Sequence, residues 1–177
     1  MKCPRCGLLV DDQVPRCRGC GFGIGDLDRR LNNPPERAGL VNDLAGALPA
    51  SDRDAMAQRL AQIHATTGGE LVVATVQTTK PVKPAEYVFW LFNRWEVGGP
   101  SHAGLLVLLA MDERRVECEV GYLWDVLVSD EGSLEILEQA VVPHLKEGRI
   151  AEGLRAGVER LADLIARGTP PREGDAR

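Results

Sequence analysis

The sequence predicts an α/β protein, an α-β-α sandwich on a small mixed sheet, with a small zinc ribbon in front of it. Two observations support this prediction. Helix-like and strand-like apolar patterns alternate between residues 51 and 167, and four cysteines form two CxxC pairs within the first 20 residues. A length of 177 residues allows one domain and a small appendage. We therefore expect a zinc ribbon over residues 1–24, a linker over 25–39, the α/β domain over 40–167 and a flexible tail over 168–177.

The cysteine motif carries the strongest chemical signal of the chain. Its two pairs are Cys3 with Cys6 and Cys17 with Cys20, and four thiolates bind Zn²⁺ tetrahedrally with no open position. Disulfides are uncommon in a reducing cytosol, so we interpret the motif as a structural zinc site. The glycine after each pair is expected to let backbone N–H groups approach sulfur. The alternative, a redox dithiol, needs only one pair and a βαβ context.

The first half of the expected domain follows a low-periodicity stretch. GIGDLDRRLNNPPERAG is rich in Gly, Asn and Pro, which is typical of a linker. Apolar residues then recur at helical spacing over 51–66, where Ser51 and Asp54 resemble a capping box and Gly68-Gly69 ends the helix. ELVVATV, residues 70–76, predicts a strand that is buried on both faces.

The second half continues the alternation. Residues 85–96 suit a helix with an aromatic-rich core face, and LLVLLA, residues 105–110, predicts a second strand buried on both faces. After a tight MDER turn, residues 115–121 return as a strand with one solvated face. Cys118 lies on the other face and is interpreted as a buried small residue rather than a nucleophile. Two helices follow, over 133–142 up to Pro143 and over 149–167. The first two strands, joined by a helix, should be parallel.

Charge and hydropathy exclude some classes of function. The first 40 residues hold seven Lys/Arg against five Asp/Glu, whereas the rest hold fourteen against twenty-one. A mildly basic ribbon with one aromatic residue, Phe22, on an acidic body argues against a nucleic-acid partner and favours a protein partner. No apolar run approaches the ~20 residues of a membrane span, and no secretory signal is recognised. A cytoplasmic location is therefore expected.

Four segments in this order carry a family resemblance: GELVVATV, LFNRWEVG, AGLLVLLAMDERRVECEVGY and VVPHLKEGRIAEGLRAGV. Their order and spacing resemble the TPM domain, known from thylakoid photosystem repair proteins and from many bacterial membrane-anchored proteins. The resemblance covers about residues 40–166. It implies an α/β sandwich fold. For function it implies weak acid phosphatase activity, binding of calcium or other divalent ions at an acidic patch, or a role in assembly or repair.

The resemblance also assigns individual positions. The family's acidic residue before the first helix matches Asp43, and its aspartate after the apolar strand matches Asp112, with a basic residue following at Arg114 or Arg115. The chain keeps Gly121-Tyr122, the first two residues of the family's GYG segment, and departs from the pattern at neighbouring positions. Leu123 replaces the second glycine and Asp125 a glutamate, while Ser129-Asp130 stands for a Thr-Asp pair and Ala103 for an asparagine. The departures remove a flexible glycine and a polar side chain from that end of the motif set.

Topology favours a second metal site at one edge of the sheet. If the first two strands are parallel, Thr78-Thr79 and Asp112-Glu113 lie at the same edge, and the approach to the first helix brings Asp43 there. Carboxylates and threonine hydroxyls suit a hard cation, Ca²⁺ or Mg²⁺, so Asp43, Asp112 and Glu113 are candidate ligands. The alternative is that these turn residues serve backbone hydrogen bonding alone.

Catalysis has little support in the pattern. His64, His102 and His144 are scattered and are better explained as surface or packing residues than as general bases. The only mechanism that the residues allow is hydrolysis by water on a cation held by Asp43 and Asp112. Two hypotheses therefore stand: a cytoplasmic binding or assembly module whose zinc ribbon docks a protein partner, and a weak metal-dependent acid phosphatase acting on phosphate monoesters.

Overall fold

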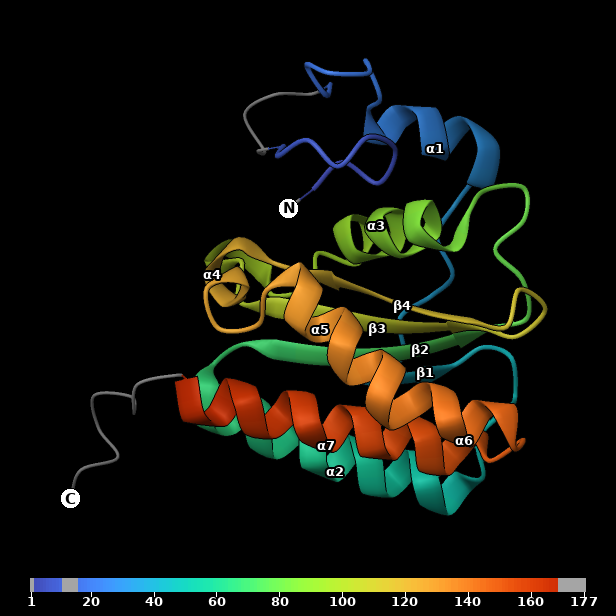
Figure 1. Ribbon diagram of the computed structural model, residues 1–177, viewed down its shortest axis with the longest axis vertical. Helices are drawn as coiled ribbons and strands as arrows, with labels where there is room; N and C mark the ends of the chain where they lie inside the picture. The colour runs from blue at the N-terminus through green and yellow to red at the C-terminus, as the bar shows by residue number, and fades with distance from the viewer. Residues whose placement is uncertain (1, 11–15, 169–177) are drawn as a thin grey trace.

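The structure, a computed structural model, describes residues 2–10 and 16–168 of the chain (Figure 1). Residues 11–15 of the expected zinc ribbon and residues 169–177 of the expected tail lie outside the described residues. In chain order the elements are α1 (Ile24–Leu31), β1 (Val41–Asp43), α2 (Ala50–Thr67), β2 (Glu70–Val76), α3 (Pro84–Arg94), η1 (Gly99–Ser101), β3 (Gly104–Ala110), β4 (Arg115–Val120), α4 (Tyr122–Asp125), α5 (Asp130–Ile136), the π-helix η2 (Leu137–Val141), α6 (Val142–Lys146) and α7 (Ile150–Gly168).

The four strands form one mixed sheet in the order β1-β2-β3-β4. β1 and β2 are parallel, β2 and β3 are parallel, and β4 returns antiparallel to β3 after a tight turn. The predicted mixed sheet is confirmed. The sequence analysis missed β1, because three residues are too few to show a strand pattern.

β2 and β3 are buried on both faces, as their apolar sequences predicted. Successive side chains of a strand point to opposite faces, so each strand serves two cores. One core, under α2 and α7, takes Leu71 and Val73 from β2 with Leu105, Val107 and Leu109 from β3. The other, under α3, takes Val72, Ala74 and Val76 from β2 with Leu106, Leu108 and Ala110 from β3. The sheet is therefore the middle layer of a sandwich.

Helices cover the two faces unequally (Figure 1). α2 and α7 lie side by side on one face, with the run from α5 to α6 beside α7, and Arg59 of α2 pairs with Glu159 and Asp163 of α7, each at 2.8 Å. α3 covers the other face, and α1 with the N-terminal segment lies beyond it. This arrangement confirms the predicted α-β-α sandwich.

Pro143 does not end the helix that was expected over 133–142. The chain stays helical from Asp130 to Lys146, passing through the π-helix η2 and then α6, with Pro143 in the first turn of α6. A proline lacks the N–H that an α-helix needs and clashes with the carbonyl one turn earlier. The wider π turn before it, in which the N–H bonds reach one residue further back, accommodates the proline without a break.

Residues 25–39 differ from the expected linker. Their first part forms α1 together with Ile24, and its Asp28 carboxylate accepts hydrogen bonds from the indole of Trp90 at 2.9 Å and from Nε of Arg94 at 2.8 Å. Further on, the carbonyl of Pro35 accepts a 2.8 Å bond from the Trp95 indole. Eight residues with one fully buried side chain, Leu27, are too few to show helical periodicity. The helix is therefore stabilised by its contacts with α3.

The face of β4 that was expected to be solvated is largely covered. Glu119 is only 8% exposed, and Glu117 lies beside α3 and the N-terminal segment. Cys118, on the other face, packs against the α7-side core, and its thiol lies 3.1 Å from the Ser133 hydroxyl. No helix in the described part of the chain has the length and apolar character that crossing a membrane requires.

Two glycines of α7 set how closely the π-helix approaches. A Cβ at Gly157 would lie 2.4 Å from Cγ2 of Val141, and one at Gly153 would lie 3.0 Å from the Val141 carbonyl oxygen. We expect Gly157→Ala to lower the free energy of unfolding by about 1–3 kcal/mol, because overpacking forces the helices apart. Urea unfolding monitored by circular dichroism measures the change.

The matched control is Gly25→Ala in α1, where a Cβ meets no atom within 4 Å. This substitution should leave stability unchanged or raise it by up to about 1 kcal/mol, since alanine has the higher helix propensity. Equal effects of the two substitutions would contradict the close packing of α7 on the π-helix.

Candidate functional site

The two CxxC pairs form two turns of the same design. In the first turn the Cys3 amide donates to the Leu8 carbonyl at 2.8 Å and the Gly7 amide to the Cys3 carbonyl at 2.9 Å. In the second, Cys17 and Gly21 make the equivalent bonds to Phe22 and Cys17 at 2.7 and 2.8 Å. Each turn presents its two cysteine sulfurs on the same side, so the two turns together can direct four sulfurs toward one point. We call residues 2–10 and 16–22 together the knuckle.

The glycines after the pairs shape the turns, and the amide that follows Gly7, that of Leu8, faces the Cys6 sulfur as expected. Gly7 and Gly21 donate to backbone carbonyls and not to sulfur, and a Cβ at either would meet nothing within 4 Å. Their φ angles of 73° and 71° lie in the left-handed region, which glycine adopts without steric penalty. Other amides that face sulfur come from within the pairs, such as Arg5 toward Cys3 and Gly19 toward Cys17.

The sulfur positions fit a tetrahedral metal. Sγ of Cys3 lies 3.6 Å from Sγ of Cys20, Sγ of Cys6 lies 3.5 Å from Sγ of Cys17, and all four lie within 4.8 Å of one another. Four thiolates at about 2.3 Å from zinc would be about 3.8 Å apart, whereas a disulfide needs about 2.05 Å. The four cysteines are free thiols. The quartet can therefore hold one metal ion, as the CxxC spacing predicted, and zinc is consistent with it.

The thiols of the quartet differ in their acidity. Burial raises the pKa of the Cys3 thiol to about 12, while the Cys20 amide bonded to its sulfur lowers the pKa of Cys17 to about 7. A bound metal takes thiolates, so its binding would release protons from the quartet.

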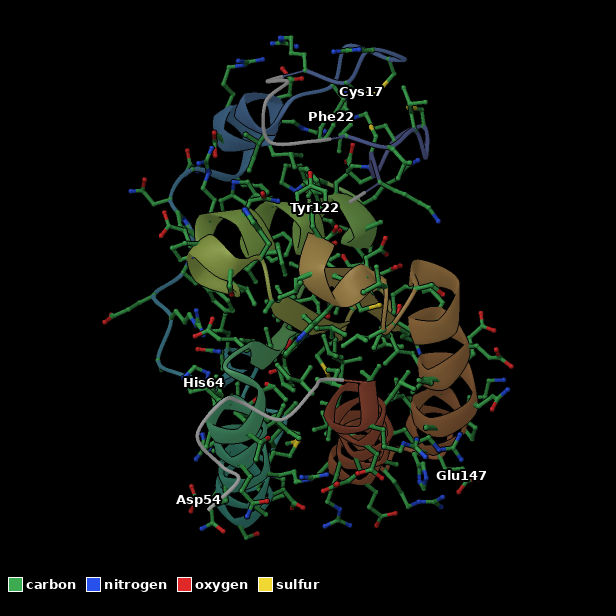
Figure 2. The ribbon with its side chains drawn as sticks, turned by 90° about the vertical axis from the view of Figure 1, so that its left-hand side faces the viewer. Cys17, Phe22, Asp54, His64, Tyr122 and Glu147 are labelled. Atoms are coloured by element: carbon green, nitrogen blue, oxygen red, sulfur yellow. The ribbon has the colours of Figure 1, made fainter. Side chains whose placement is uncertain are left out.

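The knuckle is docked on α3 by an ion pair and an aromatic contact. Figure 2 shows its Cys17 and Phe22 at the top of the molecule, in the N-terminal segment. Nε of Arg5 lies 2.6 Å from Oε1 of Glu86, whose residue is only 5% exposed. The Arg5 guanidinium also lies over the Phe22 ring, 4.5 Å from its centroid, and Phe22 packs against Phe89 at 5.9 Å. Because a stacked guanidinium and a buried carboxylate fix each other's orientation, the knuckle has a defined position on the domain.

Electrostatics support this docking. Burial alone would raise the pKa of Glu86, but the hydrogen bond from Arg5 and the Lys83 amide outweigh it, and the pKa lies below its ordinary value. The bond to Glu86 in turn raises the pKa of Arg5. The sequence analysis missed this pair, since 81 residues separate its partners; the one available signal was an acid inside an otherwise apolar helix.

Asp43 lies at the end of β1 beside Thr75, at the predicted edge of the sheet. Its carboxylate is 1% exposed and accepts hydrogen bonds from the Thr75 hydroxyl at 2.5 Å, the Ala47 amide at 2.9 Å and the Leu48 amide at 3.0 Å. Burial acts to raise the pKa of Asp43, but these bonds outweigh it and lower the pKa. The carboxylate thus fixes the loop between β1 and α2.

Asp112 and Glu113 form the turn after β3 and contact the end of β2, as the parallel topology predicted. Asp112 accepts a hydrogen bond from the Gln77 side chain, and Oε1 of Glu113 accepts bonds from the Thr78 hydroxyl at 2.6 Å and the Thr79 amide at 3.2 Å. Oε2 of Glu113 is buried and has no hydrogen-bond partner among the described residues. This oxygen is a buried carboxylate atom at the edge that no donor among the described residues satisfies.

The candidate acids do not form one ligand set with each other. Among residues 2–10 and 16–168, the cysteine quartet is the only group of three or more metal-donor side chains within reach of one ion. The histidines are equally dispersed: Nδ1 of His64 contacts the Gly69 carbonyl, His144 contacts Arg149, and His102 packs edge-on against Tyr122.

Comparison with known proteins identifies the domain. The TPM domain profile matches residues 41–164, which include the whole sheet and the helices on both its faces. The chain belongs to the TPM domain family. The knuckle and α1 precede the matched region, so they are additions to the TPM domain of this chain.

Solved structures share the fold. The N-terminal domain of a P. gingivalis protein is similar with 30% identity and a TM-score of 0.69, covering 73% of this chain and 83% of that one. The BA42 protein of Bizionia argentinensis has 19% identity and a TM-score of 0.60, covering 72% and 88%. The N-terminal domain of a Corynebacterium glutamicum protein has 19% identity and a TM-score of 0.58, covering 82% and 89%. A search of curated proteins finds no match.

Removing the Arg5 side chain tests the docking of the knuckle on the TPM domain. We expect Arg5→Ala to lower the free energy of unfolding by about 2 kcal/mol, between the values for an exposed and a buried pair, because it leaves the Glu86 carboxylate buried without its cation. Thermal melts measure the change. The control is Arg18→Ala, at an exposed position of the same knuckle, which should leave the melting temperature unchanged.

The Asp43 carboxylate should stabilise the fold in a pH-dependent manner. Its folded pKa is depressed, so its contribution is present above the unfolded value of about 3.9 and is lost as pH falls through the folded pKa. We expect Asp43→Asn to lower stability by about 1–3 kcal/mol at pH 7. The difference from wild type should shrink in urea titrations below pH 4. The exposed Asp54→Asn serves as control, and a deficit independent of pH would contradict the assignment.

Proposed function

We propose that the chain is a binding or assembly module in which a zinc-bearing knuckle presents the TPM domain to a protein partner. The observation that carries this proposal is the cysteine quartet, whose sulfur spacing suits Zn²⁺ and whose knuckle is held on α3 by Arg5 and Glu86. A fixed position relative to the TPM domain is useful for docking, since a partner can then contact both parts. Free thiolates for zinc suit a reducing compartment, and we place the protein in the cytoplasm on that basis.

Two leucines of the knuckle favour a protein as the partner. Leu8 is 47% exposed and Leu9 is 71% exposed, whereas Phe22 is buried and Val10 half-buried against the α3-side core. Apolar side chains that stay in water on a rigid turn are typical of a surface that is covered by another protein.

The proposed module also binds a divalent cation at the turn after β3. Oε2 of Glu113 supports this proposal, because a buried carboxylate oxygen without a hydrogen-bond donor is a ready ligand for Ca²⁺ or Mg²⁺. Exposed Asp112, next in the chain, can supply a second oxygen. Asp43 is less suited, since three hydrogen bonds already occupy its oxygens.

The same turn supports the alternative function, a weak metal-dependent phosphatase. A cation held by Asp112 and Glu113 could activate water for attack on a phosphate monoester. The three dispersed histidines offer no general base to such a reaction. Binding therefore remains the function that the side chains support best.

The zinc proposal predicts one zinc ion per chain by elemental analysis. Cys3→Ser should lose the metal, because three thiolates bind Zn²⁺ far more weakly, while Cys118→Ser should keep it. The TPM domain of Cys3→Ser should remain folded by circular dichroism, since the core under α2 and α7 contains no knuckle residue. Zinc retained in Cys3→Ser, or a fully unfolded chain, would contradict the proposal.

Partner docking is tested by comparing the proteins that cross-link to the full chain in cells. A partner of the knuckle should be lost with the Leu8→Ser/Leu9→Ser variant and with Cys3→Ser, and retained with Cys118→Ser and with Leu123→Ser, which removes an exposed leucine elsewhere. An identical set of cross-linked proteins for all variants would overturn the docking role.

Cation binding and phosphatase activity are separated by one titration. Ca²⁺ or Mg²⁺ should raise the melting temperature of wild type and of Asp54→Asn, and leave that of Asp112→Asn/Glu113→Gln unchanged. Turnover of p-nitrophenyl phosphate is measured in the same samples. Cation binding without turnover supports the binding module, whereas cation-dependent turnover that the double substitution abolishes establishes the phosphatase.

A further inference from the structure

A groove lies on the face of the sheet opposite α3, between the β3–β4 turn and the run of helix from α5 to α6. Its volume is about 670 Å³, within the range of about 300–1,000 Å³ that is usual for small-ligand sites. Side chains and backbone of fourteen residues line it, and most are apolar, including Leu109, Met111, Val116, Leu137, Val142 and Leu145. Neither the knuckle nor the Asp112–Glu113 carboxylates form part of this lining.

The π-helix that borders the groove is held close to α7. Gly153 and Gly157 admit Val141, and α6 continues from the π-helix through Pro143. π turns often mark functional sites, where the extra residue redirects side chains. Leu134, on α5 at the rim of the groove, is 43% exposed. Apolar surface thus stays open to water at this position.

Cations dominate the charge of the groove. Arg114, Arg115 and Lys146 line it, against one acid, Glu138. Arg115 also contacts Glu117 at 3.1 Å. Within the described part of the chain, Arg114 and Lys146 have no ion pair. This excess of positive charge is unusual in a region of the chain that is acidic overall, with fourteen Lys/Arg against twenty-one Asp/Glu after residue 40.

The turn itself separates its two acids from the arginine that follows them. Asp112 and Glu113 direct their carboxylates to Gln77 and Thr78 at the end of β2, while Arg114, whose φ is 51°, lines the groove. The left-handed conformation of Arg114 is strained for a residue with a side chain. The strained residue thus lies where the chain passes from the acids, which face the end of β2, to the arginine, which lines the groove.

We infer that this groove binds an amphipathic anion, a small molecule with an aliphatic chain and a carboxylate or phosphate head. The aliphatic chain covers the leucines and valines of the groove, and the head group pairs with Arg114 and Lys146. A small ligand fits better than a folded protein, because the groove is a concave site of ligand size rather than a flat surface. The inference does not depend on the proposed function, since the knuckle lies on the opposite face of the sheet.

Isothermal titration calorimetry with decanoate and with decyl phosphate, both below their micelle concentrations, tests the inference on the full chain. We expect saturable binding of one molecule of either anion. Butyrate, which lacks the long chain, and decyltrimethylammonium, which lacks the negative charge, should each bind at least tenfold more weakly. Equal binding of decanoate and decyltrimethylammonium would overturn the role of the cations.

Variants locate the site. Lys146→Glu and Leu134→Gln, both at exposed positions, should each weaken decanoate binding about tenfold, by charge reversal and by loss of apolar contact. Arg160→Glu, an exposed charge reversal on α7, is the control and should bind as wild type does. Melting temperatures confirm that the variants are folded. Unchanged affinity in both groove variants would overturn the site.

The same anionic head group occurs on free acyl compounds and on membrane lipids, so vesicles provide the last comparison. Vesicles of phosphatidylglycerol in phosphatidylcholine are sedimented with wild type and with Lys146→Glu. Decanoate binding without sedimentation supports a free ligand. Sedimentation that needs Lys146, without decanoate binding, would replace the small-molecule site with a membrane-contact surface and so overturn the inference.

Discussion

The burial of β2 and β3 on both faces is the constraint on which the remaining architecture depends. Each strand places alternate side chains in two separate cores, so neither face of the sheet can be left in water. α2 and α7 satisfy one face. On the other face a single helix, α3, must cover the sheet, and α3 is itself buried on nearly every side, through Val88, Phe89, Trp90, Leu91 and Phe92. A helix that is apolar all round requires further cover.

The N-terminal segment provides that cover, which relates the cysteine quartet to the fold of the domain. α1 reaches α3 through Asp28, and the knuckle reaches it through Phe22 and the pair of Arg5 with Glu86. A carboxylate as buried as Glu86 is costly without a counter-charge, so the pair mainly selects one docked position. The knuckle is therefore a small unit built around four sulfurs and also an integral part of the α3-side core.

The carboxylates of Asp43 and Glu113 lie at the same edge of the sheet but differ in their hydrogen bonds. Asp43 has its oxygens occupied by a hydroxyl and two amides, which makes it an anchor for the loop into α2. Glu113 uses one oxygen in the same manner and leaves the other without a donor. The topology places both residues at one edge, and the local donors decide which of them keeps an oxygen without a hydrogen bond. Across the sheet, the adjacent basic residues face an apolar groove, so one short turn serves two different environments.

The sequence by itself determined the long elements and the cysteine quartet. β2, β3, α2, α3 and α7 follow from apolar runs and periodicities within single segments, and the quartet follows from two CxxC pairs whose geometry is local. Only the tertiary structure decided the three-residue β1, α1, the covering of Glu119, and the partners of Glu86 and Asp43. The physical reason is range: a helix face or a CxxC turn is formed by neighbours in sequence, whereas burial and hydrogen-bond partners come from residues that only the folded chain brings together.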